Sequence, residues 1–176
     1  MINLFHVDAF TDKPFAGNPA VVCILPGPAD EEWMQNIAKE MNLSETAFLY
    51  RQDDGFNLRW FTPAVEVDLC GHATLASAHI LWENAYLKHE EEAKFYTNSG
   101  CLTASRSGEY IEMNFPSIFV KPEVAPPNLV KALGVDLKYI GKSELFCLIE
   151  VKSENILRNI KPDFEMLKTI RSCIIF

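Results

Sequence analysis

The chain has 176 residues, of which 48% are apolar and 23% are charged, and its formal net charge is −8 with a pI near 5.0. This length suggests one domain or slightly more, and the composition is that of an ordinary globular protein. An acidic chain without a basic stripe argues against nucleic-acid binding. No apolar run reaches the ~20 residues of a membrane span, and no signal peptide is visible at the N-terminus. We therefore expect no membrane partner and a cytoplasmic location.

The cysteines are five in number, and no two of them form a CxxC pair. An odd count with this spacing favours neither a disulfide framework nor a zinc site. We therefore expect free thiols and no bound metal, as is usual in a reducing compartment. The residues concerned are Cys23, Cys70, Cys101, Cys147 and Cys173.

The first part of the chain is predicted to form strands and one helix. Asp30 can cap a helix over residues 31–42, in which apolar residues recur at helical spacing, and Asn42 can end it. The Asp-Asp-Gly sequence at residues 53–55 predicts a hairpin turn. Apolar or alternating runs predict strands over residues 2–10, 21–25, 45–50, 56–61 and 65–69.

A long apolar helix is predicted over Gly71–Leu87, followed by three strands at residues 92–98, 101–107 and 110–115. Its apolar side chains point in nearly every direction, and such a helix is either buried on all sides or crosses a membrane. This one is too short and too polar to span a bilayer. We therefore expect an α+β fold in which residues 1–115 form a β-barrel wrapped around this central α-helix.

The composition changes after residue 115. Residues 116–128 contain four prolines and are predicted to be a linker. We expect residues 129–176 to be an incomplete second domain, because a last apolar strand ends flush with the chain and no second long apolar helix precedes it. Uncovered apolar surface and unpaired edges favour self-association, so we expect a homo-oligomer. The elements predicted in this part are a short helix near 129–133, strands near 137–141, 145–151 and 173–176, and helical turns near 154–159 and 164–170.

The start of the predicted central helix combines groups that suit an anion. The first N–H groups of a helix lack partners and lie at the positive end of its dipole. Gly71 allows close approach to the backbone, and His72 adds a donor whose charge changes near neutral pH. These features predict a carboxylate or another anion at Gly71, His72 and Ala73. The alternative interpretation is that His72 caps the helix inside a packed core.

Several long motifs resemble those of one enzyme family. The stretches FHVDAFTDKPFAGNPAVV, NLSETAFL and RWFTPAVEVDLCGHATLASA, with the later strands, resemble the N-terminal domain of the PhzF family of phenazine-biosynthesis isomerases. Relatives of this family include diaminopimelate epimerase and proline racemase. The resemblance is dense over residues 1–115 and looser over residues 116–176. It implies a diaminopimelate epimerase-like fold of two domains, each a β-barrel around a central helix, and an isomerase without a cofactor.

The resemblance also implies a role for Glu45, the glutamate of the SETAF motif. In PhzF-like isomerases this residue is the acid–base group that moves a proton between carbons of a small unsaturated acid. The family's site lies between the two domains, at the N-termini of their central helices. Here Leu43, Ala47 and Phe48 give Glu45 the apolar neighbours that such a group needs. From the residues alone, the simpler interpretation is an exposed glutamate between a helix and a strand.

Cys70 has two interpretations. In the racemase and epimerase relatives, a cysteine just before this glycine is one of two thiol bases, and the second comes from the second domain. This chain ends before that position, so we interpret Cys70 as a residue that lines the substrate site. The DPVTGSA-like motif with which the family's second domain completes the site does not occur here, and we expect that the chain alone is not a competent monomeric catalyst. The matching motifs contain further polar residues to which no role is assigned, namely Asp8, Asn18 and Asp68.

The sequence leaves three functions open. The first is a PhzF-like isomerase that transfers a proton by acid–base chemistry on a small carboxylate-bearing substrate. The second is an amino-acid racemase or epimerase that uses Cys70 as a base. The third is a non-catalytic protein that retains the carboxylate pocket.

Overall fold

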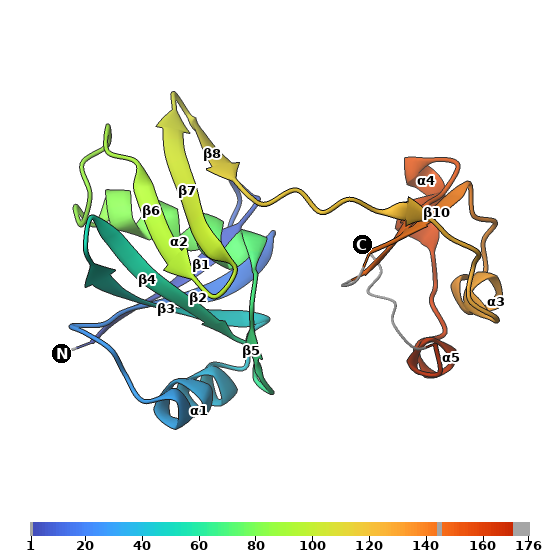
Figure 1. Ribbon diagram of the computed structural model, residues 1–176, viewed down its shortest axis with the longest axis horizontal. Helices are drawn as coiled ribbons and strands as arrows, with labels where there is room; N and C mark the ends of the chain where they lie inside the picture. The colour runs from blue at the N-terminus through green and yellow to red at the C-terminus, as the bar shows by residue number, and fades with distance from the viewer. Residues whose placement is uncertain (1, 144–145, 171–176) are drawn as a thin grey trace. The chain divides into compact units, whose positions relative to one another are not determined.

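The computed structural model describes residues 2–143 and 146–170. The chain divides into two compact units, residues 1–115 and residues 116–176 (Figure 1). None of the described helices combines the length and the apolar composition needed to cross a membrane.

The first unit contains the strands and helices that the sequence predicts for it. The central helix α2 is shorter than predicted and ends at Glu83. The backbone N–H of Asn84 donates to the carbonyl of Ile80, and Ala85 then leaves the helical conformation with a left-handed φ of 57°. The elements are β1 (Asn3–Ala9), β2 (Asn18–Ile24), α1 (Glu31–Met41), β3 (Glu45–Gln52), β4 (Gly55–Phe61), β5 (Glu66–Val67), α2 (Gly71–Glu83), β6 (Ala93–Thr97), β7 (Gly100–Ser107) and β8 (Tyr110–Asn114).

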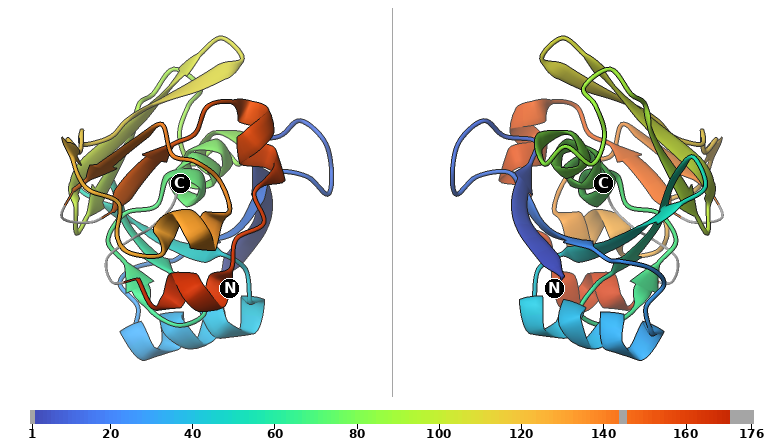
Figure 2. Two further views of the ribbon diagram at one scale, coloured as in Figure 1. Left: turned by 90° about the vertical axis from the view of Figure 1, so that its right-hand side faces the viewer. Right: turned by 90° about the vertical axis from the view of Figure 1, so that its left-hand side faces the viewer.

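One mixed sheet curves around α2. Its strand order is β1-β2-β3-β4-β6-β7-β8, and β5 pairs with the end of β4. The pairs β2–β3 and β4–β6 are parallel, and the other pairs are antiparallel. In Figure 1, α2 passes behind β6 and β7 while α1 lies at the lower edge of the unit, and Figure 2 shows the same separation of the two helices. The expected α+β barrel around a central helix is therefore present in this unit.

The two helices cover opposite faces of the sheet. Because alternate residues of a strand point to opposite faces, β2 and β3 are buried on both sides, which explains their continuous apolar runs. The outer face, under α1, buries Val21, Cys23, Phe48 and Phe61. The inner face, around α2, buries Ala20, Val22, Ala47, Leu49, Leu58 and Trp60.

The predicted ends of α1 are confirmed. The Asp30 side chain accepts a hydrogen bond from the backbone N–H of Trp33 at 2.9 Å, and Asn42 ends the helix with a left-handed φ of 52°. Arg59 of β4 binds Glu66 through two nitrogens and also contacts Glu31 at 2.8 Å. These contacts tie the start of α1 to the outer face of the sheet.

The barrel is open between β1 and β8, which do not pair within the described part of the chain. A cavity of about 530 Å³ lies at this seam, lined by the end of β1 with the loop after it, by α2 and by the start of β8. On α2, Leu75 is half-buried and His79 is exposed, four residues apart on one face. The prediction that α2 is buried on every side is therefore wrong along this line, because the sheet does not close over it.

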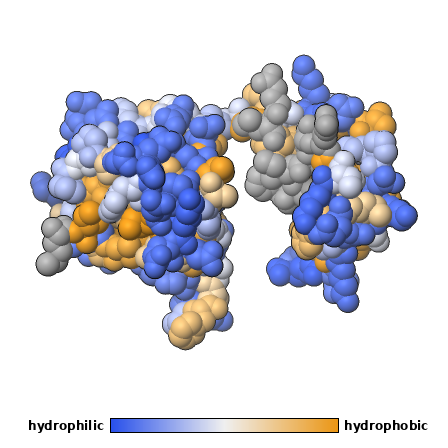
Figure 3. Space-filling view, turned by 90° about the horizontal axis from the view of Figure 1, so that it is seen from below, coloured by the Kyte–Doolittle hydropathy of each residue, from blue (hydrophilic) through white to orange (hydrophobic). Residues whose placement is uncertain are grey.

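Exposed apolar side chains occur on the first unit. The face seen from below in Figure 3 shows hydrophobic areas beside hydrophilic ones. The loop from Phe10 to Gly17 carries two of the most exposed large side chains, Phe10 at 67% and Phe15 at 103% of full exposure. The other exposed large apolar residues of the unit are Ile2, Leu4, Trp33, Val65 and Tyr110.

The second unit has a small core and a three-stranded sheet of order β11-β10-β9. The predicted linker contains β9, since Lys121 and Pro122 pair with β10. Leu129, Leu133 and Ile149 form the core. The strand predicted at residues 173–176 lies outside the described residues. The elements are β9 (Lys121–Pro122), α3 (Leu129–Leu133), β10 (Tyr139–Lys142), β11 (Cys147–Glu150), α4 (Glu154–Asn159) and α5 (Phe164–Lys168).

Candidate active site

Glu45 is the first residue of β3 and points to the inner face of the sheet. Its face follows from strand alternation, because Ala47 and Leu49, two and four residues later, both belong to the core around α2. The Glu45 side chain keeps 19% of its full exposure. The structure therefore turns this carboxylate toward the central helix rather than toward bulk solvent.

Cys70 and His72 enter the same region from the other side, at the start of α2. Cys70 is the N-cap residue, with an extended backbone, and its carbonyl accepts a hydrogen bond of 2.5 Å from the Thr74 hydroxyl. Both Cys70 and His72 are buried, at 7% and 8% of full exposure. Gly71 between them is exposed, so the chain dips into the core on either side of the glycine.

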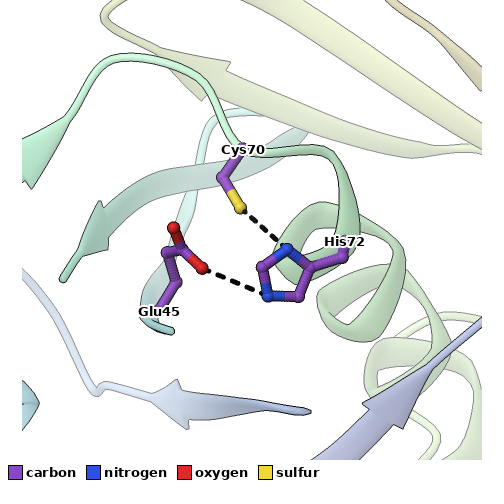
Figure 4. A group of neighbouring side chains, drawn as sticks. All are labelled: Glu45, Cys70 and His72. Carbon is purple, nitrogen blue, oxygen red and sulfur yellow. Dashed lines mark hydrogen bonds and ion pairs between the residues drawn. The ribbon is translucent and has the colours of Figure 1, made fainter. Parts of the chain in front are cut away.

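The three side chains form a continuous polar row, which Figure 4 shows in one view. The Cys70 Sγ atom lies 3.4 Å from Nδ1 of His72, and Nε2 of His72 lies 3.2 Å from Oε2 of Glu45. The imidazole ring thus stands between the thiol and the carboxylate. The Nε2–Oε2 pair has the length but not the full alignment of a hydrogen bond, and both atoms are buried with no other hydrogen-bond partner among the described residues.

The thiol of Cys70 is held in its neutral form. Burial raises the pKa of the Cys70 thiol to about 12, and the negative charge of Glu45 acts in the same direction. The backbone N–H groups of Ala73 and His72 oppose this shift without cancelling it. A thiol with this pKa is protonated at neutral pH, so Cys70 is neither an activated nucleophile nor a ready base.

The same three residues could in principle contact a metal ion, because one donor atom from each lies within 4.8 Å of the others. A cysteine binds metal as the thiolate, however, and burial favours the protonated thiol here. The donor set therefore suits proton exchange better than metal binding. Of the other predicted free thiols, Cys23 and Cys101 are unpaired by disulfides, and Cys173 lies outside the described residues.

The predicted anion site at the mouth of α2 is accessible at one of its three residues. A methyl group added at Gly71 would meet no atom within 4 Å, so the space in front of this residue is open. His72 and Ala73 are buried below it, at 8% and 0% of full exposure. An anion that approached the helix would meet Gly71 first.

The three polar residues without an assigned role do not join the cluster. Asp8 lines the cavity at the seam, and Asp68 accepts a hydrogen bond from Ser99 through its backbone carbonyl. Asn18 begins β2 and accepts a hydrogen bond of 3.4 Å from the hydroxyl of Ser44, the residue before Glu45. The family resemblance led us to expect Glu45 near the start of the central helix, but the sequence analysis did not predict its contact with His72.

Comparison with known proteins identifies one family of related sequences. The PhzC-PhzF family, described as phenazine biosynthesis-like protein, matches residues 7–176. A protein of Halalkalibacterium halodurans named an uncharacterized isomerase is 54% identical over 168 residues, which are 95% of this chain and 63% of that protein. The human phenazine biosynthesis-like domain-containing protein is 40% identical over 187 aligned residues, covering 96% of this chain and 64% of its own. This chain thus spans somewhat less than two thirds of these relatives.

Solved structures agree in fold. The crystal structure of a PhzF-family phenazine biosynthesis protein from Enterococcus faecalis superimposes with a TM-score of 0.87 at 39% identity, covering 98% of this chain and 66% of that one. A predicted epimerase from Pseudomonas aeruginosa, at 21% identity and a TM-score of 0.72, shares the fold, with 98% of this chain and 68% of the other covered. The barrel around α2, the matched sequence and these relatives together show that the chain belongs to the PhzC-PhzF family of phenazine biosynthesis-like proteins.

Proposed function

We propose that this chain carries the acid–base part of an isomerase site and that Glu45 transfers a proton on a small substrate bearing a carboxylate. The observation that supports this most is the position of Glu45, which is largely buried on the inner face of β3 and 3.2 Å from His72. A carboxylate in such a place can exchange a proton with a bound carbon acid. The names of the relatives as isomerases point to the same class of reaction.

The substrate carboxylate is assigned to the start of α2. The exposed Gly71 offers the first contact, and the positive end of the helix dipole extends over His72 and Ala73. Cys70 lines this site from the N-cap position. No cofactor takes part in the proposed proton transfer, because the proton moves between Glu45 and carbon atoms of one substrate.

Two other functions were open on the sequence. A racemase with Cys70 as base is disfavoured, because burial raises the pKa of this thiol to about 12. A non-catalytic carboxylate-binding protein would use the same N-terminus of α2, and the exchange experiment below distinguishes it from an isomerase. The predicted homo-oligomer is a further proposal, which light scattering of the purified chain tests directly.

The test is deuterium exchange into bound acids. The chain is incubated in D₂O with a panel of small unsaturated and hydroxylated carboxylic acids, and incorporation at carbon is followed by NMR. Glu45→Gln should reduce the exchange rate by about 10²–10⁴-fold while the affinity for the acid, measured by calorimetry, changes little. Glu40→Gln, at an exposed position on α1, is the matched control and should leave both quantities unchanged.

Two outcomes would contradict the proposal. Full exchange activity in Glu45→Gln would exclude Glu45 as the acid–base group. Because this chain spans 63% of the Halalkalibacterium halodurans relative, the same panel is run on that protein as well. Binding of carboxylates without exchange in both proteins would favour the non-catalytic protein.

A further inference from the structure

The hydrogen bonds along the row of Cys70, His72 and Glu45 can run in one of two directions, from the thiol to the carboxylate or the reverse. An imidazole ring that is neutral carries one proton, so one ring nitrogen donates a hydrogen bond and the other accepts one. Here each nitrogen faces a different partner, Nδ1 the thiol and Nε2 the carboxylate. The protonation of the thiol thus decides which nitrogen of His72 carries the proton.

We propose that Cys70 is a positioning residue, whose thiol donates to Nδ1 of His72 and so fixes the imidazole as the Nε2–H form that donates to Oε2 of Glu45. The inference rests on the proposed function, since it takes Glu45 as the acid–base group. It gives Cys70 a role that is neither that of a nucleophile nor that of a base. The reacting atom in this arrangement is Oε1 of Glu45, because Oε2 is held by the ring.

The distances of both links suit hydrogen bonds, and the Nε2–Oε2 link needs only a small rotation to become fully aligned. A thiol is a weak donor, and 3.4 Å between sulfur and nitrogen is a suitable length for its hydrogen bond. The thiol, the ring and the carboxylate oxygen Oε2 are all buried, so water does not compete for these contacts. Figure 4 shows the second carboxylate oxygen of Glu45 turned away from the imidazole ring.

The electrostatics of Cys70 agree with this direction. Burial raises the pKa of its thiol to about 12, so the sulfur keeps its proton at neutral pH and can donate it. A thiolate would instead accept from Nδ1–H and would leave a bare Nε2 facing the negative carboxylate. Two lone pairs would then oppose each other at 3.2 Å in a buried place, which costs free energy.

The row would hold the Glu45 carboxyl group in one orientation, which a general base needs. Glu45 must change its protonation state during the proposed reaction, and its carboxyl group must keep one orientation while it does so. A ring that donates to Oε2 meets this demand, because Oε2 accepts a hydrogen bond both when Oε1 is ionised and when it carries the proton. No tautomer change of His72 is then needed during turnover.

The experiment reads the tautomer directly. Long-range ¹H–¹⁵N NMR of the histidine rings in the full chain distinguishes a protonated from a bare ring nitrogen, and a His72→Gln variant assigns the signals among the four histidines. We expect Nε2 protonated and Nδ1 bare at neutral pH. Cys70→Ala should shift the ratio toward the Nδ1–H form by roughly fivefold, as expected for one lost hydrogen bond of ordinary strength. Cys70→Ser, which keeps a donor at the same place, should restore the wild-type signals.

The control is Cys101→Ala, which removes an exposed thiol elsewhere in the unit and should leave the His72 signals unchanged. An Nδ1–H tautomer in the wild-type chain would overturn the inference, as would a Cys70→Ala variant with unaltered His72 signals. Cys70→Ala should also lower the rate of deuterium exchange in the same panel of acids, and Cys70→Ser should restore it. If Glu45→Gln loses exchange but the wild-type ring is in the Nδ1–H form, this inference is wrong and the proposed function stands. If Glu45→Gln keeps full exchange, the proposed function is wrong.

Discussion

Replacing Leu81 by alanine tests how tightly the sheet packs around α2. Leu81 is fully buried in the core cluster of the first unit. Removing about three buried carbon atoms costs roughly 2.5 kcal/mol in transfer free energy. The cavity left behind raises the expected loss of unfolding free energy to about 3–5 kcal/mol, because strands on several sides restrict any collapse.

Leu75→Ala is the matched control on the same helix. Leu75 lies on the line that faces the open seam and is only half-buried, so its truncation should cost about 1 kcal/mol. The same change of residue type cancels the difference in helix propensity between the two variants.

Urea unfolding followed by tryptophan fluorescence measures both variants. The three tryptophans Trp33, Trp60 and Trp82 all belong to the first unit, so the signal reports this unit and not residues 116–176. The reasoning predicts that Leu81→Ala is less stable than Leu75→Ala by about 2 kcal/mol or more. Equal losses of unfolding free energy in the two variants would refute this reasoning, because they would mean that Leu75 and Leu81 are enclosed to the same degree.

Three further predictions concern the same unit. Asp30→Ala removes the hydrogen bond to the first turn of α1 and should lower the free energy of unfolding by about 1 kcal/mol in the same urea assay. Gly55→Ala should be more damaging, because the added carbon would lie 2.6 Å from the Lys94 carbonyl oxygen across the β4–β6 pair, and thermal unfolding should show a lower Tm. Burial raises the pKa of both Cys23 and Cys70 from 9.0 to about 12 in the folded chain, so between pH 9 and 12 the unfolded state binds fewer protons and stability falls as pH rises. Replacing either thiol by serine should remove up to roughly 4 kcal/mol of this alkaline loss, and an unchanged pH dependence would contradict the raised pKa.

The sequence predicted the elements of the first unit well because its patterns are local. The Asp30 and Asn42 caps, the hairpin at residues 53–55 and the apolar helix after Cys70 each have a signal within a few residues. The end of α2 was predicted too late, because the apolar residues Tyr86 and Leu87 extend the helical pattern past Asn84, which ends the helix as Asn42 ends α1.

The open seam and the polar row were not predictable in the same way. An apolar helical wheel shows that α2 is buried but not where the surrounding sheet stops, which depends on the pairing of strands far apart in sequence. The row required Glu45 and His72 to meet across 27 positions of chain. The resemblance to the SETAF motif pointed to Glu45 and to the start of the central helix, but only the fold gives the distance from the carboxylate to the ring.

The tight hairpin between β3 and β4 has a consequence for handedness. β2 and β3 are parallel and joined through α1, while β4 and β6 are parallel and joined through α2, and both connections step the same way across the sheet. Because β4 runs opposite to β3, two right-handed crossovers must pass on opposite faces of the sheet. The reversal at Asp53 and Asp54 thus sends the second helix to the inner face, where Glu45 already points. The meeting of the carboxylate and the imidazole therefore follows from the chirality of the chain path, set eight residues after Glu45 by a two-residue turn.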